Sequence, residues 1–125
     1  MPLPPKRPST TWRGQRGEEA ACRILEQKGL KVLERNFMTA RGEVDIIASD
    51  RDALCFIEVK SWQRELWPDL GLSVTARKRQ RIRRTAMVWL DAHREMADQK
   101  RLRFDLFLYD PENGGHEWLI SALDY

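Results

Sequence analysis

Two short apolar runs that carry ionisable residues constrain the fold of this chain more than any other feature. The first run, residues 44–48, contains an aspartate, and the second, residues 54–60, contains a glutamate and a lysine. β-Branched residues bounded by turn residues are typical of strands. Residues 49–52 between the runs, Ser-Asp-Arg-Asp, are typical of a turn. The two runs are therefore predicted to form a β-hairpin with a carboxylate on each strand.

The spacing predicts that three ionisable side chains gather at one point. A turn centred within residues 50–51 places Asp45 opposite Phe56 and makes Glu58 its diagonal neighbour, about 7–8 Å away between backbones. Lys60 lies two residues beyond Glu58 and therefore on the same face. Because burying unpaired carboxylates is costly, a hard divalent cation is a natural partner for this pair. The alternative is an exposed sheet face on which Lys60 forms salt bridges with solvated acids.

The charge of the chain is unevenly distributed. The net charge is +3, and residues 1–16 carry four basic residues and no acidic one. Residues 77–84 hold six basic residues in eight positions. Such a run is either a phosphate-binding face or the solvated surface of an ordinary helix. The first interpretation predicts a nucleic-acid interface made by Lys78, Arg79, Arg81, Arg83 and Arg84.

Hydrophobic periodicity and helix stop signals predict a mixed α/β domain over residues 12–125. Gly29 is the expected end of the first helix, and Thr75 is the expected N-cap of the second. Ile82, Ala86, Trp89 and Leu90 are spaced as one apolar stripe of that second helix. The predicted elements are a helix at 15–28, strands at 31–36, 44–48 and 54–60, a helix after residue 75, and strands around 104–108 and 118–123.

Two further acids have alternative interpretations. Glu18 lies three and seven residues before Ala21 and Leu25, and so on the core side of the first helix. Glu18 either reaches the predicted metal site, caps its own helix or pairs with a nearby arginine. Glu43 lies two residues before Asp45 on the same strand face, either as a partner of the metal ligands or as the exposed end of the strand.

The composition excludes several classes of protein. No uninterrupted apolar run is longer than five residues, so no membrane span is expected. Residues 1–11 are rich in proline and lack the apolar segment of a signal peptide. They are predicted to form a flexible basic arm, and the protein is expected in the cytoplasm. Cys22 and Cys55 stand at apolar positions and are expected to be buried thiols rather than a disulfide or zinc ligands.

Several motifs together resemble the YraN-like family of bacterial proteins, an uncharacterised group with a restriction-endonuclease-like fold. An aspartate followed by Glu-x-Lys on the adjacent strand is similar to the signature of such nucleases. Val44 stands where proline is usual, and Trp62 stands where many relatives have arginine, a role that Arg64 is placed to take. The matching segments are Gly17-Glu18-x-x-Ala21, Gly29, Asn36-Phe37, Gly42-Glu43-Val44-Asp45-Ile46-Ile47, Phe56-Ile57-Glu58-Val59-Lys60, Thr75-x-x-Lys78 and Arg103-Phe104-Asp105.

The resemblance implies a central mixed β-sheet of about five strands flanked by helices. It also implies a layout similar to archaeal Holliday junction resolvases, and hence a metal-dependent nuclease. Asp45, Glu58 and the Val59 carbonyl would then hold Mg²⁺ or Mn²⁺. Lys60 would orient or deprotonate the attacking water, and Glu18 would complete the metal shell.

The expected partner is nucleic acid, with DNA expected before RNA. A branched DNA substrate would favour a homodimer, because a two-fold junction needs two active sites. Two other classes remain open. One is a nucleic-acid-binding protein without catalysis, and the other is a protein-interaction adaptor with an apolar patch around Trp62 and Trp67. Salt-dependent binding of DNA separates the first of these from the second.

Overall fold

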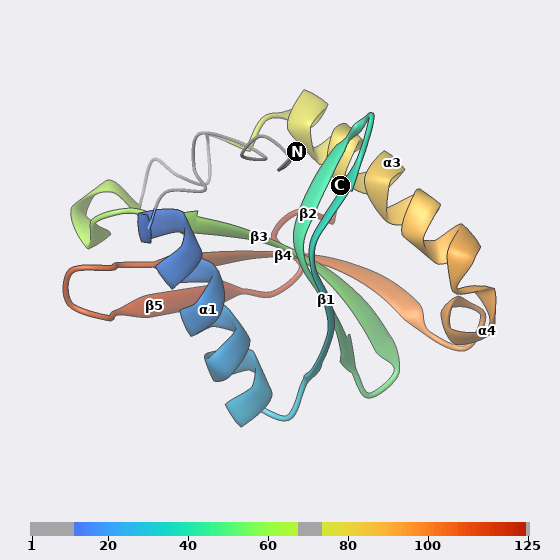
Figure 1. The fold of residues 1–125 in the computed structure, drawn as a ribbon, viewed down its shortest axis with the longest axis horizontal. Helices are drawn as coiled ribbons and strands as arrows, with labels where there is room; N and C mark the ends of the chain where they lie inside the picture. Colours follow the sequence, from blue (N-terminus) through green and yellow to red (C-terminus); the bar gives the residue numbers. More distant parts are fainter. Residues whose placement is uncertain (1–11, 68–73, 125) are drawn as a thin grey trace, which may run out of the picture.

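The computed structural model describes residues 12–67 and 74–124. The arm predicted at residues 1–11 lies outside these ranges. The elements follow in the order α1 (Trp12–Gln27), β1 (Lys31–Thr39), β2 (Gly42–Asp50), β3 (Ala53–Ser61), η1 (Arg64–Leu66), α3 (Ala76–Ala92), α4 (Arg94–Ala97), β4 (Arg101–Tyr109) and β5 (His116–Leu119), as Figure 1 shows.

The five strands form one mixed sheet in the order β1-β2-β3-β4-β5. Neighbouring strands are antiparallel except β3 and β4, which are parallel. A parallel pair needs a long crossover between its strands, and here α3 and α4 lie within that connection. The predicted α/β class, with a central mixed sheet flanked by helices, is confirmed.

Alternate residues of β3 face two separate apolar cores. Leu54 and Phe56 belong to the cluster that includes the buried side of α3, whereas Cys55 and Ile57 belong to the cluster that includes α1. All residues from 53 to 59 are buried, as is typical of a strand covered on both faces. The ionisable residues at the end of β3 are therefore held by a rigid central strand.

Helix α1 begins three residues earlier than predicted and ends at Gln27, one residue before the predicted end, with Gly29 in its C-terminal cap as expected. Gly29 has φ 94°, a conformation that glycine adopts without strain. The Leu30 amide donates to the Leu25 carbonyl at 3.1 Å and the Gly29 amide donates to the Glu26 carbonyl at 3.0 Å, which is the Schellman pattern. The predicted stripe of the helix is buried and consists of Ala21, Cys22 and Leu25.

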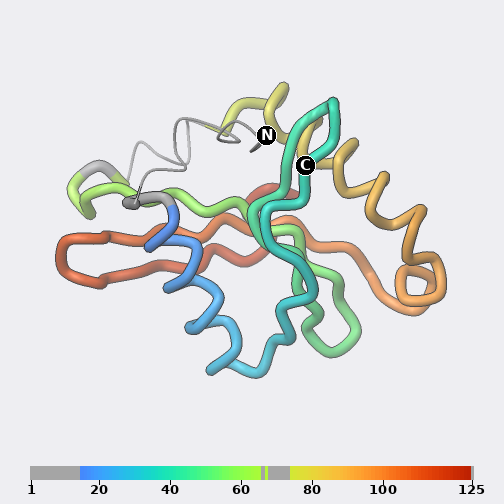
Figure 2. Tube along the Cα trace, in the orientation of Figure 1, coloured from blue at the N-terminus to red at the C-terminus, as the bar shows by residue number. Residues whose placement is uncertain are grey.

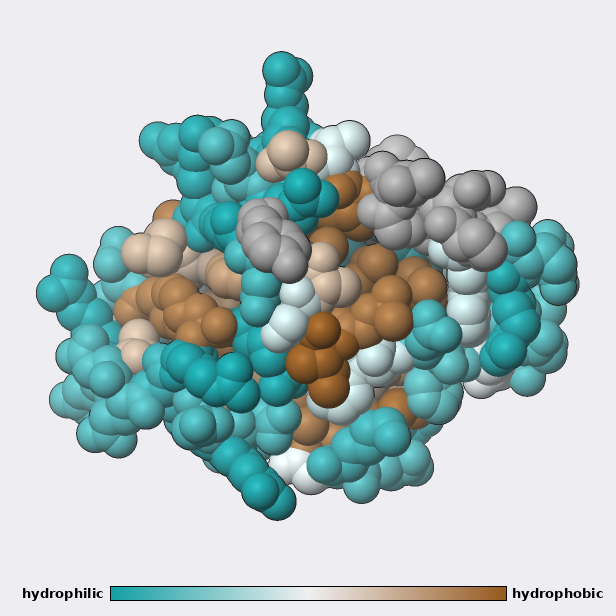
Figure 3. Space-filling model, turned by 180° about the vertical axis from the view of Figure 1, so that it is seen from behind, coloured by the Kyte–Doolittle hydropathy of each residue, from teal (hydrophilic) through white to brown (hydrophobic). Residues whose placement is uncertain are grey.

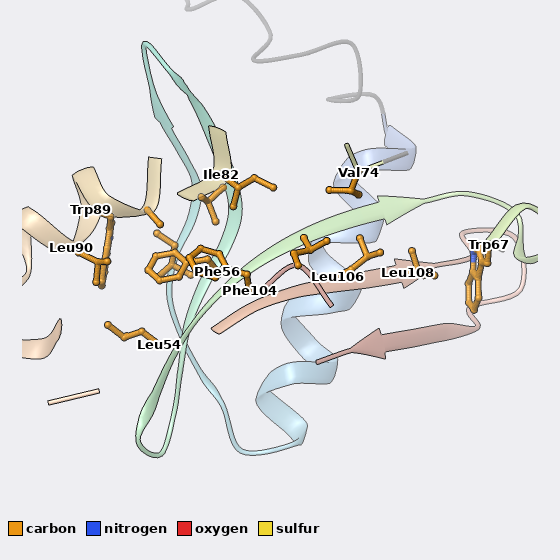
Figure 4. Packing of buried hydrophobic residues seen from close by; sticks show 14 residues of the cluster. Leu54, Phe56, Trp67, Val74, Ile82, Trp89, Leu90, Phe104, Leu106 and Leu108 are labelled. Carbon is orange, nitrogen blue, oxygen red and sulfur yellow. The ribbon is translucent and has the colours of Figure 1, made fainter. Parts of the chain in front are cut away.

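Helix α3 packs on the opposite face of the sheet from α1. The predicted stripe is confirmed, because Ile82, Ala86, Trp89 and Leu90 are all buried. The Phe56 ring stacks on Phe104 at 5.4 Å between centroids and meets the Trp89 ring edge-on at 6.1 Å (Figure 4). These contacts fix the helix over the middle of the sheet.

The two tryptophans of the loop after β3 behave differently from each other. Trp67 is buried at the far end of the α3 core, beyond Leu108 (Figure 4). Its indole Nε1 donates to the Trp62 carbonyl at 3.0 Å. Trp67 thus covers this end of the core, whereas the side chain of Trp62 is exposed.

The β1–β2 hairpin departs from the rest of the sheet (Figures 1 and 2). The pairing of β2 with β3 ends at Ile46 and Ile57, whereas β1 and β2 remain paired as far as Thr39 and Gly42. Asn36 lies in this part of β1 with φ 54°, a value that asparagine tolerates better than most residues. The outer part of the hairpin reaches the first half of α3, so β2 and β3 diverge where their ionisable residues lie.

The last strand is shorter and earlier than predicted. β5 spans His116–Leu119, and the chain turns at Ser121, which has φ 61°. The buried Asp105 carboxylate accepts hydrogen bonds from the Ser121 amide at 2.8 Å and the Trp118 indole at 3.0 Å. It also forms an ion pair with Arg103 at 3.1 Å. These bonds draw the chain out of the strand, which is why the predicted range 118–123 is wrong.

Two predictions about the chain as a whole can be compared with the structure. Within residues 12–67 and 74–124, no helix is both long enough and apolar enough to span a membrane. Cys22 and Cys55 are free thiols and both are buried, as expected.

Candidate functional site

The register of the β2–β3 hairpin differs from the predicted one by two residues. Ile47, rather than Asp45, lies opposite Phe56. The turn consists of Arg51 and Asp52, with Arg51 at φ 52°, so its centre lies one residue later than predicted. A shift of two keeps every side chain on its own face. Asp45 therefore stays on the predicted face but moves along the strand, away from Phe56.

Asp45 lies at the point where β2 and β3 separate. Its side chain is fully buried, and Oδ2 accepts a hydrogen bond of 2.8 Å from the Val59 amide. The Asp45 carboxylate thus takes the place of the next backbone hydrogen bond between β2 and β3, and it holds the end of β3. The bond also brings Asp45 beside Glu58, the residue before Val59, so the two predicted carboxylates lie at one place in the fold.

Two lysines surround the Glu58 carboxylate. Lys78 Nζ lies 2.7 Å from Glu58 Oε2, and Lys60 Nζ lies 3.5 Å from the same oxygen. Glu58 is 3 % exposed, whereas the lysines retain 31 % and 20 % of their side-chain exposure. The alternative of an exposed face with solvated acids is therefore wrong for Glu58.

The two lysines differ in how strongly they hold a proton. Burial lowers the pKa of Lys60 below its ordinary value, and the Glu58 carboxylate only partly opposes that shift. Burial also acts on Lys78, but the negative charges of Glu58 and Asp45 outweigh it and raise the pKa of Lys78. Lys78 is thus the firm counter-charge of the site, and Lys60 is the lysine that loses its proton more readily.

The first turn of α3 places Lys78. Thr75 caps the helix as predicted, with its hydroxyl accepting a hydrogen bond of 3.1 Å from the Lys78 amide. The Arg79 amide donates to the Thr75 carbonyl at 2.9 Å. Four residues after Lys78, Ile82 enters the apolar core. The cap and the core contact therefore fix the start of the lysine side chain above β3.

A cleft of about 470 Å³ opens above Glu58 and Lys60. One wall is the end of the β1–β2 hairpin, residues 38–43, and the other is α3 at Lys78, Arg81 and Ile82. A Cβ atom added to Gly42 would lie 3.2 Å from Thr85 Oγ1 and 3.6 Å from Arg81 Cβ. The hairpin backbone thus rests directly on the helix, and a larger residue at this glycine would push the two walls apart.

The lining of the cleft carries more positive than negative charge. Its cations are Arg41, Lys60, Lys78 and Arg81, and its acids are Glu43 and Glu58. Glu43 is neither the exposed end of the strand nor buried, because it lines the cleft with intermediate exposure. A net positive cleft above buried carboxylates suits an anionic ligand such as a phosphate.

Glu18 lies on α1, on the other face of the sheet, next to a residue that packs against the end of β3. A Cβ atom added to Gly17 would lie 2.9 Å from Ser61 Cβ and 3.6 Å from a methyl carbon of Val59, so this part of α1 is in close contact with the end of β3. Glu18 is buried and lies inside the helix, which begins at Trp12. The interpretation of Glu18 as a helix cap is therefore wrong.

The acids of the site do not form a larger cluster. Among residues 12–67 and 74–124, no group of three or more histidine, cysteine, aspartate or glutamate side chains is arranged to hold a metal ion. The site consists of the Asp45 and Glu58 carboxylates with Lys60 and Lys78 beside Glu58. Any further ligand has to come from backbone oxygen, water or substrate.

The predicted arginines of α3 point in different directions. The Arg79 guanidinium donates to the Val74 carbonyl at 2.8 Å. Arg83 donates to the Leu123 carbonyl at 3.2 Å and lies over the Phe104 ring. Arg81 lines the cleft and Arg84 is exposed. The structure therefore brings Arg81 and Lys78 to the site, while Arg79 and Arg83 bond to the protein's own backbone.

Two parts of the site did not follow from the sequence pattern. The sequence pattern does not predict that the hairpin end with Arg41 forms a cleft wall, because that role depends on the twist of β1 and β2. Lys78 was expected to meet phosphate, whereas in this structure it pairs with Glu58. The one available signal was Gly42, which permits the close approach of hairpin and helix.

Comparison with known proteins places the chain among sequences of one family. The family model described as uncharacterised protein family UPF0102 matches residues 17–108, which include every candidate residue of the site. A UPF0102 protein of a Bradyrhizobium species is 39 % identical over 123 residues, covering 98 % of this chain and 88 % of the relative. One from Halorhodospira halophila is 42 % identical over 112 residues, covering 88 % and 85 %. One from Pseudomonas aeruginosa is 34 % identical over 122 residues, covering 94 % and 97 %.

Proposed function

The chain belongs to the uncharacterised protein family UPF0102, and we propose that it is a divalent-metal-dependent nuclease that hydrolyses phosphodiester bonds, with DNA as its first expected substrate. The observation that supports this most is the meeting of two buried carboxylates, Asp45 and Glu58, beside a net positive cleft. Glu58 lines that cleft together with Lys60 and Lys78, the two lysines that contact its carboxylate. A restriction-endonuclease-like fold, implied by the resemblance of the motifs, is part of this proposal.

The donor set fits magnesium or manganese. Both cations prefer oxygen ligands, and Mg²⁺ is commonly held by one or two carboxylates together with water and substrate phosphate. Asp45 and Glu58 would be those carboxylates, with the Val59 carbonyl, water and substrate oxygens as further ligands. When bound, the cation would polarise the phosphate and lower the pKa of a coordinated water.

The side chains of this protein have separate tasks in the proposed reaction. Lys78 is the lysine whose pKa is raised, so it would stay protonated and offset the charge that builds on the phosphate. Lys60 has a lowered pKa, which suits a group that orients the attacking water and accepts its proton. Arg41 and Arg81 on the two walls of the cleft would hold the flanking phosphates.

A second candidate function is nucleic-acid binding without hydrolysis. The observation in its favour is the 2.7 Å ion pair between Lys78 and Glu58, because a protein cation already neutralises one of the two carboxylates. A protein-interaction adaptor has less support, since Trp67, half of its expected patch, is buried. Apolar side chains do show at the surface of the face seen in Figure 3, but apolar atoms contribute much of the surface of any folded protein.

The nuclease proposal is tested by incubating labelled nucleic acids with the full chain. The panel contains single strands, duplex, flaps and a four-way junction, as DNA and as RNA, with Mg²⁺, Mn²⁺ or EDTA. Asp45→Asn and Lys60→Ala are the test variants, and Asp91→Asn and Lys28→Ala are matched controls at exposed positions. Sedimentation with and without the junction measures whether a homodimer forms.

The outcomes separate the candidate functions. Metal-dependent cleavage that both test variants lose and both controls keep supports the nuclease. Salt-sensitive binding without cleavage supports the binding protein and contradicts the nuclease. If the protein neither binds nor cleaves any nucleic acid of the panel, the protein-interaction adaptor is the function that remains.

A further inference from the structure

The cleft above Glu58 differs from a surface built for an intact duplex. Its volume of about 470 Å³ is within the range that holds one small ligand and is far smaller than a turn of double helix. The contact of Gly42 with Thr85 and Arg81 closes the cleft on the side where the hairpin meets α3. A cleft of this size suits a single extended chain better than a double helix.

The two walls of the cleft have different chemistry. The α3 wall presents the charged ends of Lys78 and Arg81, whereas the hairpin wall presents the apolar side chain of Met38 beside Arg41. Met38 is 45 % exposed, although large apolar side chains are usually buried in the core. The hairpin wall also carries the charged Arg41 and Glu43, so Met38 is its one large apolar side chain. Cations on both walls with an exposed apolar side chain between them match a chain that has phosphates and flat apolar groups.

An unpaired nucleic-acid strand has this chemistry, and a duplex does not offer it. Single-strand sites combine a positive groove for the backbone with apolar or aromatic side chains against the faces of bases. In a duplex the base faces are stacked inside, and Met38 has nothing apolar to contact unless base steps are pried apart. At this site the exposed Met38 can therefore make apolar contact only with the bases of an unpaired strand.

We propose that the cleft binds an unpaired strand of nucleic acid, with its phosphates on Lys78 and Arg81 of α3 and a base against Met38 of the β1–β2 hairpin. This inference rests on the proposed function, because it names the form of the substrate at that same site. The scissile phosphate then lies over Glu58 and Lys60, and the hairpin is the element that excludes the complementary strand.

The test measures binding in EDTA, so that cleavage plays no part. Fluorescence anisotropy compares a labelled 12-nucleotide single strand, as DNA and as RNA, with a blunt duplex of the same sequence. Met38→Ala is paired with the control Met87→Ala, which removes another exposed methionine, from α3 outside the cleft. Arg81→Ala is paired with Arg94→Ala, which removes an exposed arginine from α4.

The expected result is tighter binding of the single strand than of the duplex. Met38→Ala should weaken single-strand binding about threefold to tenfold without changing its salt dependence, since it removes apolar contact alone. Arg81→Ala should lower the salt slope by about one, since it removes one phosphate contact. The two controls should leave both quantities unchanged, and circular dichroism should show the same fold for all variants.

The inference is overturned if the blunt duplex binds as tightly as the single strand, or if Met38→Ala is as neutral as Met87→Ala. Failure of the nuclease proposal has a different signature, namely intact single-strand preference with no metal-dependent cleavage of any substrate. Cleavage of blunt duplex by a protein without strand preference would preserve the nuclease and refute the unpaired strand.

Discussion

Lys78 Nζ lies 2.7 Å from Glu58 Oε2 and is nearer to that carboxylate than Lys60, which is on the same strand as Glu58. The pair links the first turn of α3 to the end of β3. Because Glu58 is 3 % exposed, its charge has to be compensated inside the protein. The contact is therefore structural in the absence of ligand, and it also holds the cation-rich wall of the cleft over the carboxylates.

Replacing Lys78 with methionine should destabilise the fold. The variant leaves a buried carboxylate with Lys60 as the remaining lysine contact, and breaking a buried pair is costly. Lys78 keeps 31 % of its side-chain exposure, so we expect a loss of about 1–3 kcal/mol rather than the full cost of a dry pair. Urea unfolding measures the change. The double variant Lys78→Met/Glu58→Gln should recover part of the loss, and a single variant as stable as wild type would contradict the structural role.

Much of the fold was predictable because it depends on local apolar patterns. The alternation around Phe56 and the spacing of Ile82, Ala86 and Trp89 place their elements correctly, since a wrong face would expose whole rows of apolar side chains. The register was not predictable to the residue. It depends on whether Arg51 adopts a positive φ, and at that position the sequence has no glycine to signal it.

The sequence predicts which residues form the candidate site, but it does not predict which of them contact one another. Asp45, Glu58 and Lys60 come together because one hairpin carries them. Lys78 joins them through a crossover of more than a dozen residues, and no local pattern states which carboxylate it meets. The cleft wall at Met38 and Arg41 depends on the divergence of β2 from β3, a tertiary property of the twisted hairpin.

The two thiols should be unreactive in the folded protein. Burial raises the pKa of Cys55 to about 12 and also raises the pKa of Cys22. At pH 8 a thiol with a pKa of about 12 is a thiolate in about one molecule in ten thousand, and the thiolate is the reactive form. Iodoacetamide at pH 8 should modify neither cysteine in buffer and both in 8 M urea, as mass spectrometry will show. Rapid labelling of Cys55 in buffer would contradict its burial.

Adding one methyl group at Gly17 should destabilise the protein even though alanine favours helix. The new Cβ atom would lie 2.9 Å from Ser61 Cβ, closer than packed carbon atoms approach. Relief of the clash requires α1 to move away from β3, at a cost of about 1–3 kcal/mol, which exceeds the helix propensity gain of about 1 kcal/mol. Thermal unfolding of Gly17→Ala measures the balance.

A compensating variant makes this prediction specific. Ser61→Gly removes the atom that Gly17→Ala would strike, so the double variant should be more stable than Gly17→Ala alone. If Gly17→Ala is instead more stable than wild type, the close contact between α1 and the end of β3 is not present in solution.

Divalent cations should stabilise the wild-type protein through Asp45 and Glu58. A ligand present at ten times its dissociation constant adds about 1.4 kcal/mol to stability, which corresponds to about 5 °C in Tm for a domain of this size. Asp45→Asn should abolish that increase, because the amide keeps an acceptor for the Val59 amide but loses the charge that attracts the cation. Differential scanning fluorimetry with Mg²⁺, Mn²⁺ or matched NaCl measures the shift. The control Asp91→Asn, at an exposed position, should retain the increase in Tm. If Asp45→Asn and Glu58→Gln both show the same increase as wild type, the cation binds elsewhere in the protein.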